Sequence, residues 1–264
     1  MTTVLTAPGE LTVAGNYAID PERSAAAFRV QLGALVLSMA GLLFVMYPAL
    51  RPFSDESSLQ GAAAFGSTAW LAAHMLAMVA FILTGFGVFA LHLSLQDTPA
   101  ERVSFWALIV GWMGIGLTLP FYGGEAFGLH AIGQRALADQ SPALVSMAGD
   151  VRSGAGLVMF LTGLLLLAVG AILTAIAVWK SGLLARWSGI PFAIGFATYI
   201  PQFFGSQPLR VGHGLLVMMG CLLLAAGLWR RATGGLSASL SCNPGSHVTV
   251  RASDSPGRGV RNSA

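Results

Sequence analysis

The sequence predicts an all-α, polytopic integral membrane protein, built as a bundle of six transmembrane helices. Of its 264 residues, 55% are hydrophobic and only 9% are charged, whereas a soluble domain carries roughly 25% charged residues. The apolar residues gather into six blocks, each close to the roughly 20 residues with which a helix crosses about 30 Å of hydrocarbon. These blocks lie near residues 30–50, 68–93, 103–122, 155–179, 184–204 and 211–229.

The basic residues predict which way this bundle faces. If both termini and the even-numbered loops share one side, that side holds ten Lys and Arg residues, and the other side holds four. Because Lys and Arg are enriched in cytoplasmic loops, we expect a multi-pass protein of the cell membrane with both termini in the cytoplasm. The basic pI of about 9.2 is then a topology signal, and nucleic acid is not an expected partner. The four outer residues are Arg51, Arg135, Arg152 and Arg210.

The chain divides into an arm, a bundle and a tail. Residues 1–25 are mixed and weakly polar, and no cleavable signal peptide is visible near Met1, so we expect a cytoplasmic arm with little fixed structure. Residues 26–231 contain the six predicted helices. Residues 232–264 are rich in Gly, Ser and Arg, a composition typical of a disordered cytoplasmic tail.

Local signals mark the ends of the first helices. The first block ends beside Tyr47 and Pro48, an interfacial pattern. The second opens with Ser67 or Thr68 as N-cap and Trp70 as an interface anchor. A tight turn over 96–101 then leads into the third.

The third block ends with a helix breaker and is followed by the longest connection. Pro120 breaks or kinks a helix over 103–122 because proline lacks a backbone donor. Residues 124–138 have enough apolar side chains either to lie at the outer interface or to continue the helix as a stub. We expect 123–153 to form a long outer loop, and loops of that length in a compact bundle tend to be functional.

The last three blocks differ in polarity. The fourth, 155–179, has no ionisable residue and is expected to form a lipid-facing wall. The fifth runs outward to Tyr199 and Gln202, and the sixth begins around His213, between two glycines.

The candidate site lies at the outer end of the bundle, where the chain carries most of its ionisable groups at membrane depth. We expect Glu125 to act as a general acid, since a half-dry environment disfavours its charged form. Alternatively, Glu125 is a rim carboxylate paired with Arg135, Arg152 or Arg210. His130 follows five residues later, so it converges with Glu125 only if the backbone is irregular.

Three histidines complete the predicted catalytic set with Glu125. His74, His130 and His213 are expected to act as bases or orienting groups, although each imidazole can instead simply hydrogen-bond to a neighbouring helix. The expected partners are membrane lipids and a substrate that is apolar or amphipathic, similar to a lipid or an isoprenoid. The residues expected to bind this substrate are Tyr122, Tyr199, Gln202, Phe121 and Phe204.

Two other functions are compatible with the sequence. The first is a b-type haem protein that moves electrons, with His74 and His213 as axial ligands. The second is a transporter or an accessory subunit, disfavoured because the helix middles are apolar. The sequence contains no GxxxxGK, HExxH or DDxxD-like motif, which argues against an ATP-driven pump and a metalloprotease, and we predict no metal site.

Overall fold

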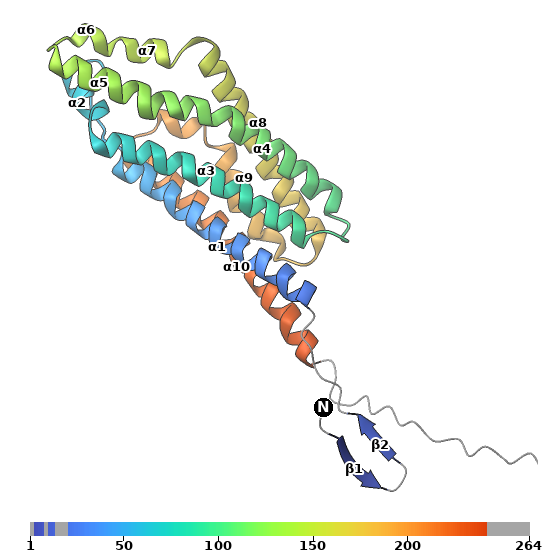
Figure 1. Cartoon of the computed structure of the whole chain (residues 1–264). Coiled ribbons are helices and arrows are strands. Elements are labelled where there is room, and N and C mark those ends of the chain that lie inside the picture. Colours follow the sequence, from blue (N-terminus) through green and yellow to red (C-terminus); the bar gives the residue numbers. More distant parts are fainter. Residues whose placement is uncertain (1–2, 8–9, 14–20, 242–264) are drawn as a thin grey trace, which may run out of the picture.

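The computed structural model describes residues 3–7, 10–13 and 21–241, and these are mainly helical (Figure 1). Two strands, β1 (Thr3–Ala7) and β2 (Glu10–Val13), pair antiparallel. Three 3₁₀ or π segments, labelled η, interrupt the helices. In order, the elements are α1 (Pro21–Leu50), α2 (Leu59–Phe65), α3 (Thr68–Ser94), α4 (Glu101–Gly123), η1 (Gly124–Gly128), α5 (Leu129–Ala138), α6 (Pro142–Val145), α7 (Met147–Val151), α8 (Gly154–Ser181), η2 (Arg186–Gly189), α9 (Ile190–Ala197), η3 (Pro201–Phe204) and α10 (Gln207–Ser241).

Among the described residues, five helices are long and apolar enough to cross a membrane. They lie within α1, α3, α4–α5, α8 and α10, and they correspond to five of the six predicted blocks. The remaining block, 184–204, is interrupted: a 3₁₀ turn, the eight-residue α9 and a second 3₁₀ turn replace one long helix. Pro191 opens α9 and Pro201 opens η3, since proline suits a first turn but not a helix interior.

The third helix is longer than predicted. It runs from Glu101 to Ala138 through Pro120, so the segment after Pro120 continues the helix rather than forming an irregular loop. At 1.5 Å per residue such a helix is roughly 57 Å long, well beyond the roughly 30 Å of a hydrocarbon layer. The helix is therefore longer than one crossing of a membrane requires.

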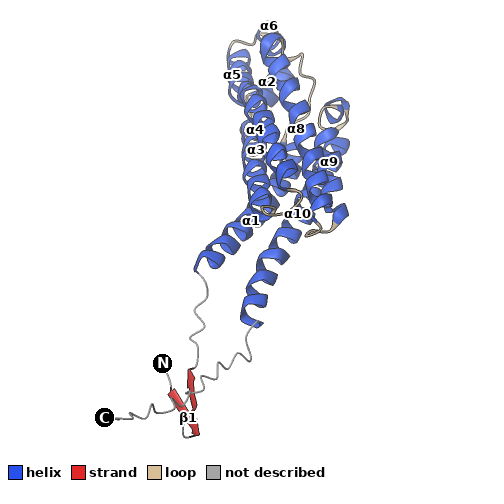
Figure 2. Ribbon diagram, turned by 90° about the vertical axis from the view of Figure 1, so that its right-hand side faces the viewer, coloured by secondary structure: helices blue, strands red, loops and turns tan. Residues whose placement is uncertain are grey.

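The extension packs into a small second core at one end of the bundle. We call α2, α5, α6 and α7 the cap, and Figures 1 and 2 show them together at the end away from the start of α1 and the end of α10. A separate cluster of buried side chains holds the cap together: Ala62, Phe65, Trp70, Leu129, Ala136, Val145 and Ala148. The predicted outer loop 123–153 is thus largely helical.

Close helix packing in the bundle depends on glycine. Helix α4 packs along α8, and α1 packs along both α3 and α10. A Cβ added at Gly114 would lie 2.7 Å from the backbone nitrogen of Leu167 on α8, so only glycine permits this approach. Gly116, two residues later on the same helix, faces open space.

The described residues near the two ends of the chain form strands and a helix. Within the predicted arm 1–25, the alternating β-prone segments form β1 and β2, and Pro21 begins α1. At the other end α10 extends to Ser241, ten residues into the predicted disordered tail 232–264. The rest of that tail, 242–264, lies outside the described residues.

Candidate functional site

Glu125 lies in the π-helical turn η1, where α4 leaves the bundle for the cap. The N–H of Leu129 donates to the carbonyl of Gly124 five residues earlier, so one extra residue is accommodated in this turn. The indole N–H of Trp70 donates to the Glu125 carbonyl at 2.7 Å and fixes the turn against α3. Such π turns are frequent at functional sites because they reorient one side chain within a helix.

The Glu125 carboxylate is held by a two-pronged ion pair. Arg152, at the end of α7, donates from Nε to Oε1 at 2.5 Å and from Nη2 to Oε2 at 2.9 Å. Paired hydrogen bonds of this kind fix the orientation of both planar groups. Of the alternatives for Glu125, pairing with Arg152 is the arrangement found.

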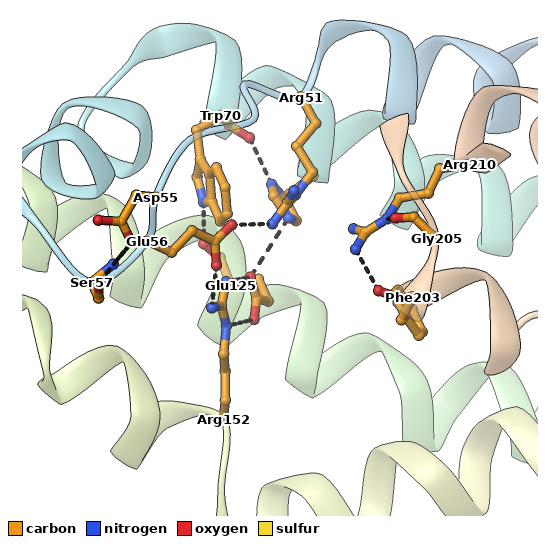
Figure 3. A network of polar contacts seen from close by, with 11 residues as sticks. Arg51, Asp55, Glu56, Ser57, Trp70, Glu125, Arg152, Phe203, Gly205 and Arg210 are labelled. Carbon is orange, nitrogen blue, oxygen red and sulfur yellow. Dashed lines mark hydrogen bonds and ion pairs between the residues drawn. The ribbon is translucent and has the colours of Figure 1, made fainter. Parts of the chain in front are cut away.

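The ion pair is part of a chain of alternating charges (Figure 3). Arg152 also donates from Nη1 to Glu56 at 2.6 Å, and Arg51 donates to the second oxygen of Glu56 at 2.7 Å. We call Arg51, Glu56, Arg152 and Glu125 the ion-pair network. It ties the segment between α1 and α2 to η1 and to the start of α8.

Aromatic rings cover the cationic members of the network. The Arg51 guanidinium lies 4.5 Å from the centre of the Trp70 ring, and the Arg152 guanidinium lies 5.5 Å from that of Phe65. Cation–π contacts of this kind stabilise guanidinium groups where little water is available. The rings also keep the network in a low-dielectric environment, which strengthens its ion pairs.

The network favours the charged forms of Glu56 and Arg152. Partial burial alone would raise the pKa of the Glu56 carboxyl, but Arg51 and Arg152 outweigh it and the pKa is lowered. Burial alone would lower the pKa of Arg152, yet its bonds to Glu125 and Glu56 raise that pKa above its ordinary value. The Glu56–Arg152 pair is therefore charged throughout the physiological pH range.

His74 is buried on α3, close to Glu125. Its Nδ1 lies 2.8 Å from the Trp70 carbonyl, and a carbonyl only accepts, so Nδ1 carries a hydrogen. Its Nε2 lies 3.7 Å from Oε2 of Glu125.

A cavity of about 530 Å³ opens beside the network. Its lining combines three arginines and two glutamates with apolar and aromatic side chains. The charged and polar members are Arg51, Glu56, Glu125, Arg152, Arg210 and Ser54, and the others are Tyr47, Phe53, Phe121, Tyr122, Leu157, Phe160, Leu161, Ile200, Phe203 and Phe204.

Four of the predicted site residues line this cavity: Glu125, Phe121, Tyr122 and Phe204. Tyr199 and Gln202 instead border a small neighbouring hollow of about 10 Å³ together with His213. The hydroxyls of Tyr122 and Tyr199 are 3.1 Å apart and link the two spaces.

Two of the predicted catalytic histidines point elsewhere. His213 donates from Nε2 to the carbonyl of Gly195 at 2.8 Å and so ties α10 to α9. In the cap, His130 pairs with the Phe65 carbonyl at 3.0 Å and with the amide of Gln134 at 3.1 Å. Both therefore follow the alternative in which an imidazole joins neighbouring helices.

The pair proposed as haem ligands does not face an open space. Ring contacts run from His74 to Tyr122 and from Tyr199 to His213, and the two tyrosine hydroxyls join them. His213 also uses Nε2 for its backbone contact. These residues do not fit a porphyrin between His74 and His213.

The arginines of the cavity were not recognised from the sequence as site residues. Arg51, Arg152 and Arg210 are three of the four basic residues on the side that the charge pattern assigns to the exterior. The fourth, Arg135, pairs with Asp139 on the cap surface. Their position on the predicted outer side, where Lys and Arg are less frequent, was the sequence feature that could have marked them as site residues.

No family model, curated protein or solved structure matches this chain. Within the described part of the chain, no group of three or more His, Cys, Asp or Glu side chains could hold a metal ion. The cavity and the ion-pair network are therefore the features of this protein that bear on its function.

Proposed function

We propose that this membrane protein binds an amphipathic, lipid-like molecule in the cavity and acts on it by acid–base chemistry through Glu125 and His74. The single observation that carries the proposal is the cavity itself, whose lining includes both charged groups and aromatic and aliphatic groups. A molecule with a polar head and an apolar body satisfies both kinds of group at once.

The proposed location is the cell membrane, with both termini in the cytoplasm and the cap outside. The ten-to-four distribution of basic residues supports this orientation. With this orientation the cavity lies near the outer end of the bundle, within reach of molecules in the outer leaflet.

The arrangement supports a base role for Glu125 in the first step, in place of the acid role expected from the sequence. Glu125 lines the cavity, and both oxygens of its carboxyl group accept hydrogen bonds from Arg152. In this step the carboxylate takes a proton from an O–H or activated C–H bond of the substrate, whose electron pair remains on the substrate. The nearby guanidinium groups stabilise that negative charge, and His74 can hold or return the proton behind Glu125.

Binding is tested by mass spectrometry of the intact protein released from lipid nanodiscs. We expect an amphiphile to remain bound to the wild-type protein and to be lost from Leu161→Trp, which fills the cavity. The matched control is Leu165→Trp, one helical turn later on α8, where the side chain is 59% exposed. A wild-type protein that retains no amphiphile would contradict the proposal.

Chemistry is tested by incubating the protein with a total membrane lipid extract in D₂O. We expect a deuterated or converted lipid species that forms with the wild-type protein and not with Glu125→Gln. A lipid profile that is identical for both proteins would contradict the proposed acid–base chemistry but not the proposed binding of an amphiphile.

A transporter is the second candidate, and one observation favours it. The interrupted segment η2–α9–η3 resembles the discontinuous helices on which transporters build binding sites, and Ile200, Phe203 and Phe204 from its outer part line the cavity. Uptake of a bound amphiphile into proteoliposomes, without chemical change, would support this candidate over the enzyme.

A further inference from the structure

The cavity wall carries one more positive than negative formal charge, from three arginines and two glutamates. Arg51 and Arg152 are paired with Glu56 and Glu125 in the ion-pair network. Arg210 is different: among the described residues no carboxylate forms an ion pair with it. The surplus positive charge of the cavity is therefore located at Arg210.

Backbone contacts fix the Arg210 guanidinium at the cavity edge. It donates to the carbonyls of Gly205, at 3.1 Å, and Phe203, at 2.5 Å, and lies 5.0 Å from the centre of the Phe53 ring (Figure 3). Carbonyl oxygens satisfy hydrogen bonds without neutralising the charge. Arg210 also lies in the first turn of α10, where the helix dipole disfavours a cation and favours an anion.

The apolar part of the lining is partly open. Phe121 and Phe160 stack with ring centres 4.1 Å apart, and both line the cavity. Leu157 and Leu161 on α8 and Phe204 in η3 line the cavity and are also exposed, Phe204 by 90%. In a membrane, side chains exposed in this way contact lipid tails, so the cavity is continuous with an apolar exterior.

We infer that the occupant of the cavity is an amphiphile with an anionic head, a carboxylate or a phosphate, and that Arg210 is the residue that binds this head. The apolar chain of the ligand then lies along Phe121 and Phe160 and leaves between Leu161 and Phe204. This inference rests on the proposed function and adds the charge of the ligand and the residue that selects it. The ion-pair network stays intact, because the anion needs no partner from it.

The test compares ligands that share a C16 chain and differ in the head group. The probes are hexadecyl phosphate, hexadecanoic acid and hexadecanol, with inorganic phosphate as the head alone, titrated against the protein in phosphatidylcholine nanodiscs. We expect both anionic amphiphiles to bind at least tenfold more tightly than hexadecanol. Inorganic phosphate should bind at least a hundredfold more weakly than hexadecyl phosphate.

Variants at Arg210 separate charge from folding. Arg210→Gln should lose the tenfold preference for anionic heads while keeping the affinity for hexadecanol, and Arg210→Lys should retain most of the preference. Unchanged hexadecanol binding shows that the cavity is still formed. Arg135→Gln, which removes an exposed arginine from the cap, should change neither affinity.

The possible outcomes distinguish this inference from the function on which it rests. Equal binding of hexadecanol and the anionic amphiphiles, or an unchanged preference in Arg210→Gln, would overturn the assignment of the head group and leave amphiphile binding in place. Phosphate binding as tight as that of hexadecyl phosphate would identify a free anion as the ligand. If no C16 probe binds the wild-type protein, the proposed function fails as well.

Discussion

At the scale of single residues, Arg152 has the greatest influence on the charge balance of the site. It compensates Glu125 through two hydrogen bonds and Glu56 through a third. Glu125 is only 8% exposed, and a buried carboxylate without a partner is costly. Removing Arg152 leaves Glu56 paired with Arg51 and leaves Glu125 with His74 as its remaining close partner.

Replacing Arg152 should therefore destabilise the protein. For Arg152→Met we expect a loss of roughly 3 kcal/mol, the lower end of the range for breaking a buried ion pair. Arg135→Met, which breaks the exposed pair with Asp139, should cost about 0–1 kcal/mol. Thermal unfolding in detergent compares the two, and equal effects would show that the network adds nothing beyond a surface pair.

The lowered pKa of Glu56 predicts an acid-sensitive fold. Its ordinary value is 4.5, and the folded-state pKa is lower, so its ion pairs contribute fully at neutral pH. That contribution starts to fall when the pH nears 4.5 and is lost as the pH passes through the folded pKa. Stability measured from pH 7 to pH 3 should fall in this acidic window, and Glu56→Gln should show a shallower fall over the same window.

At the scale of elements, the contact between α4 and α8 depends on Gly114. The variant Gly114→Ala places a Cβ 2.7 Å from the Leu167 backbone nitrogen and should cost about 1–3 kcal/mol, as overpacking does. Gly116→Ala on the same helix meets nothing within 4 Å and should be neutral or stabilise the protein by up to about 1 kcal/mol. Thermal unfolding of the two variants measures the difference, and a stable Gly114→Ala protein would contradict this packing.

The hydrophobic blocks predicted the long helices. They did not predict the π turn η1 or the interrupted segment η2–α9–η3, which both contribute residues to the site. Five of the six blocks contain a helix long enough to span the membrane, because block length alone determines this feature. The broken block 184–204 and the uninterrupted passage through Pro120 depend on tertiary contacts. One such contact is the bond from Trp70 to the Glu125 carbonyl, which joins residues far apart in sequence.

The residues of the site also divide into those that the local sequence identifies and those that depend on tertiary contacts. Glu125 was identifiable from the sequence because it is a carboxylate next to an apolar helix. The roles of Arg51, Arg152 and Arg210 were not, since a count of charges by loop cannot show that three of them converge on one cavity. The partners of His130 and His213 are backbone carbonyls, which no residue pattern identifies.

At the scale of the whole molecule, the proposed orientation of the bundle predicts which loops can be labelled from outside the cell. Ser146 is exposed in the cap, and Gln96 is exposed in the turn at the opposite end. In a variant with Cys242 replaced by serine, Ser146→Cys should react with a membrane-impermeant maleimide in intact cells. Gln96→Cys should react only after permeabilisation, and the reverse result would place the cavity on the cytoplasmic side.

The π turn at Gly124–Gly128 lies between α4 and α5 in one continuous helix. It sets how far α5 is rotated about the helix axis relative to α4. Each residue of an α-helix advances the chain by about 100° around its axis. Deleting one residue from this turn would restore a regular α-helix and would rotate α5 by about that angle around the helix axis. The cap would then meet the rest of the protein with a different side, and Glu125 and Arg152 would no longer lie opposite each other.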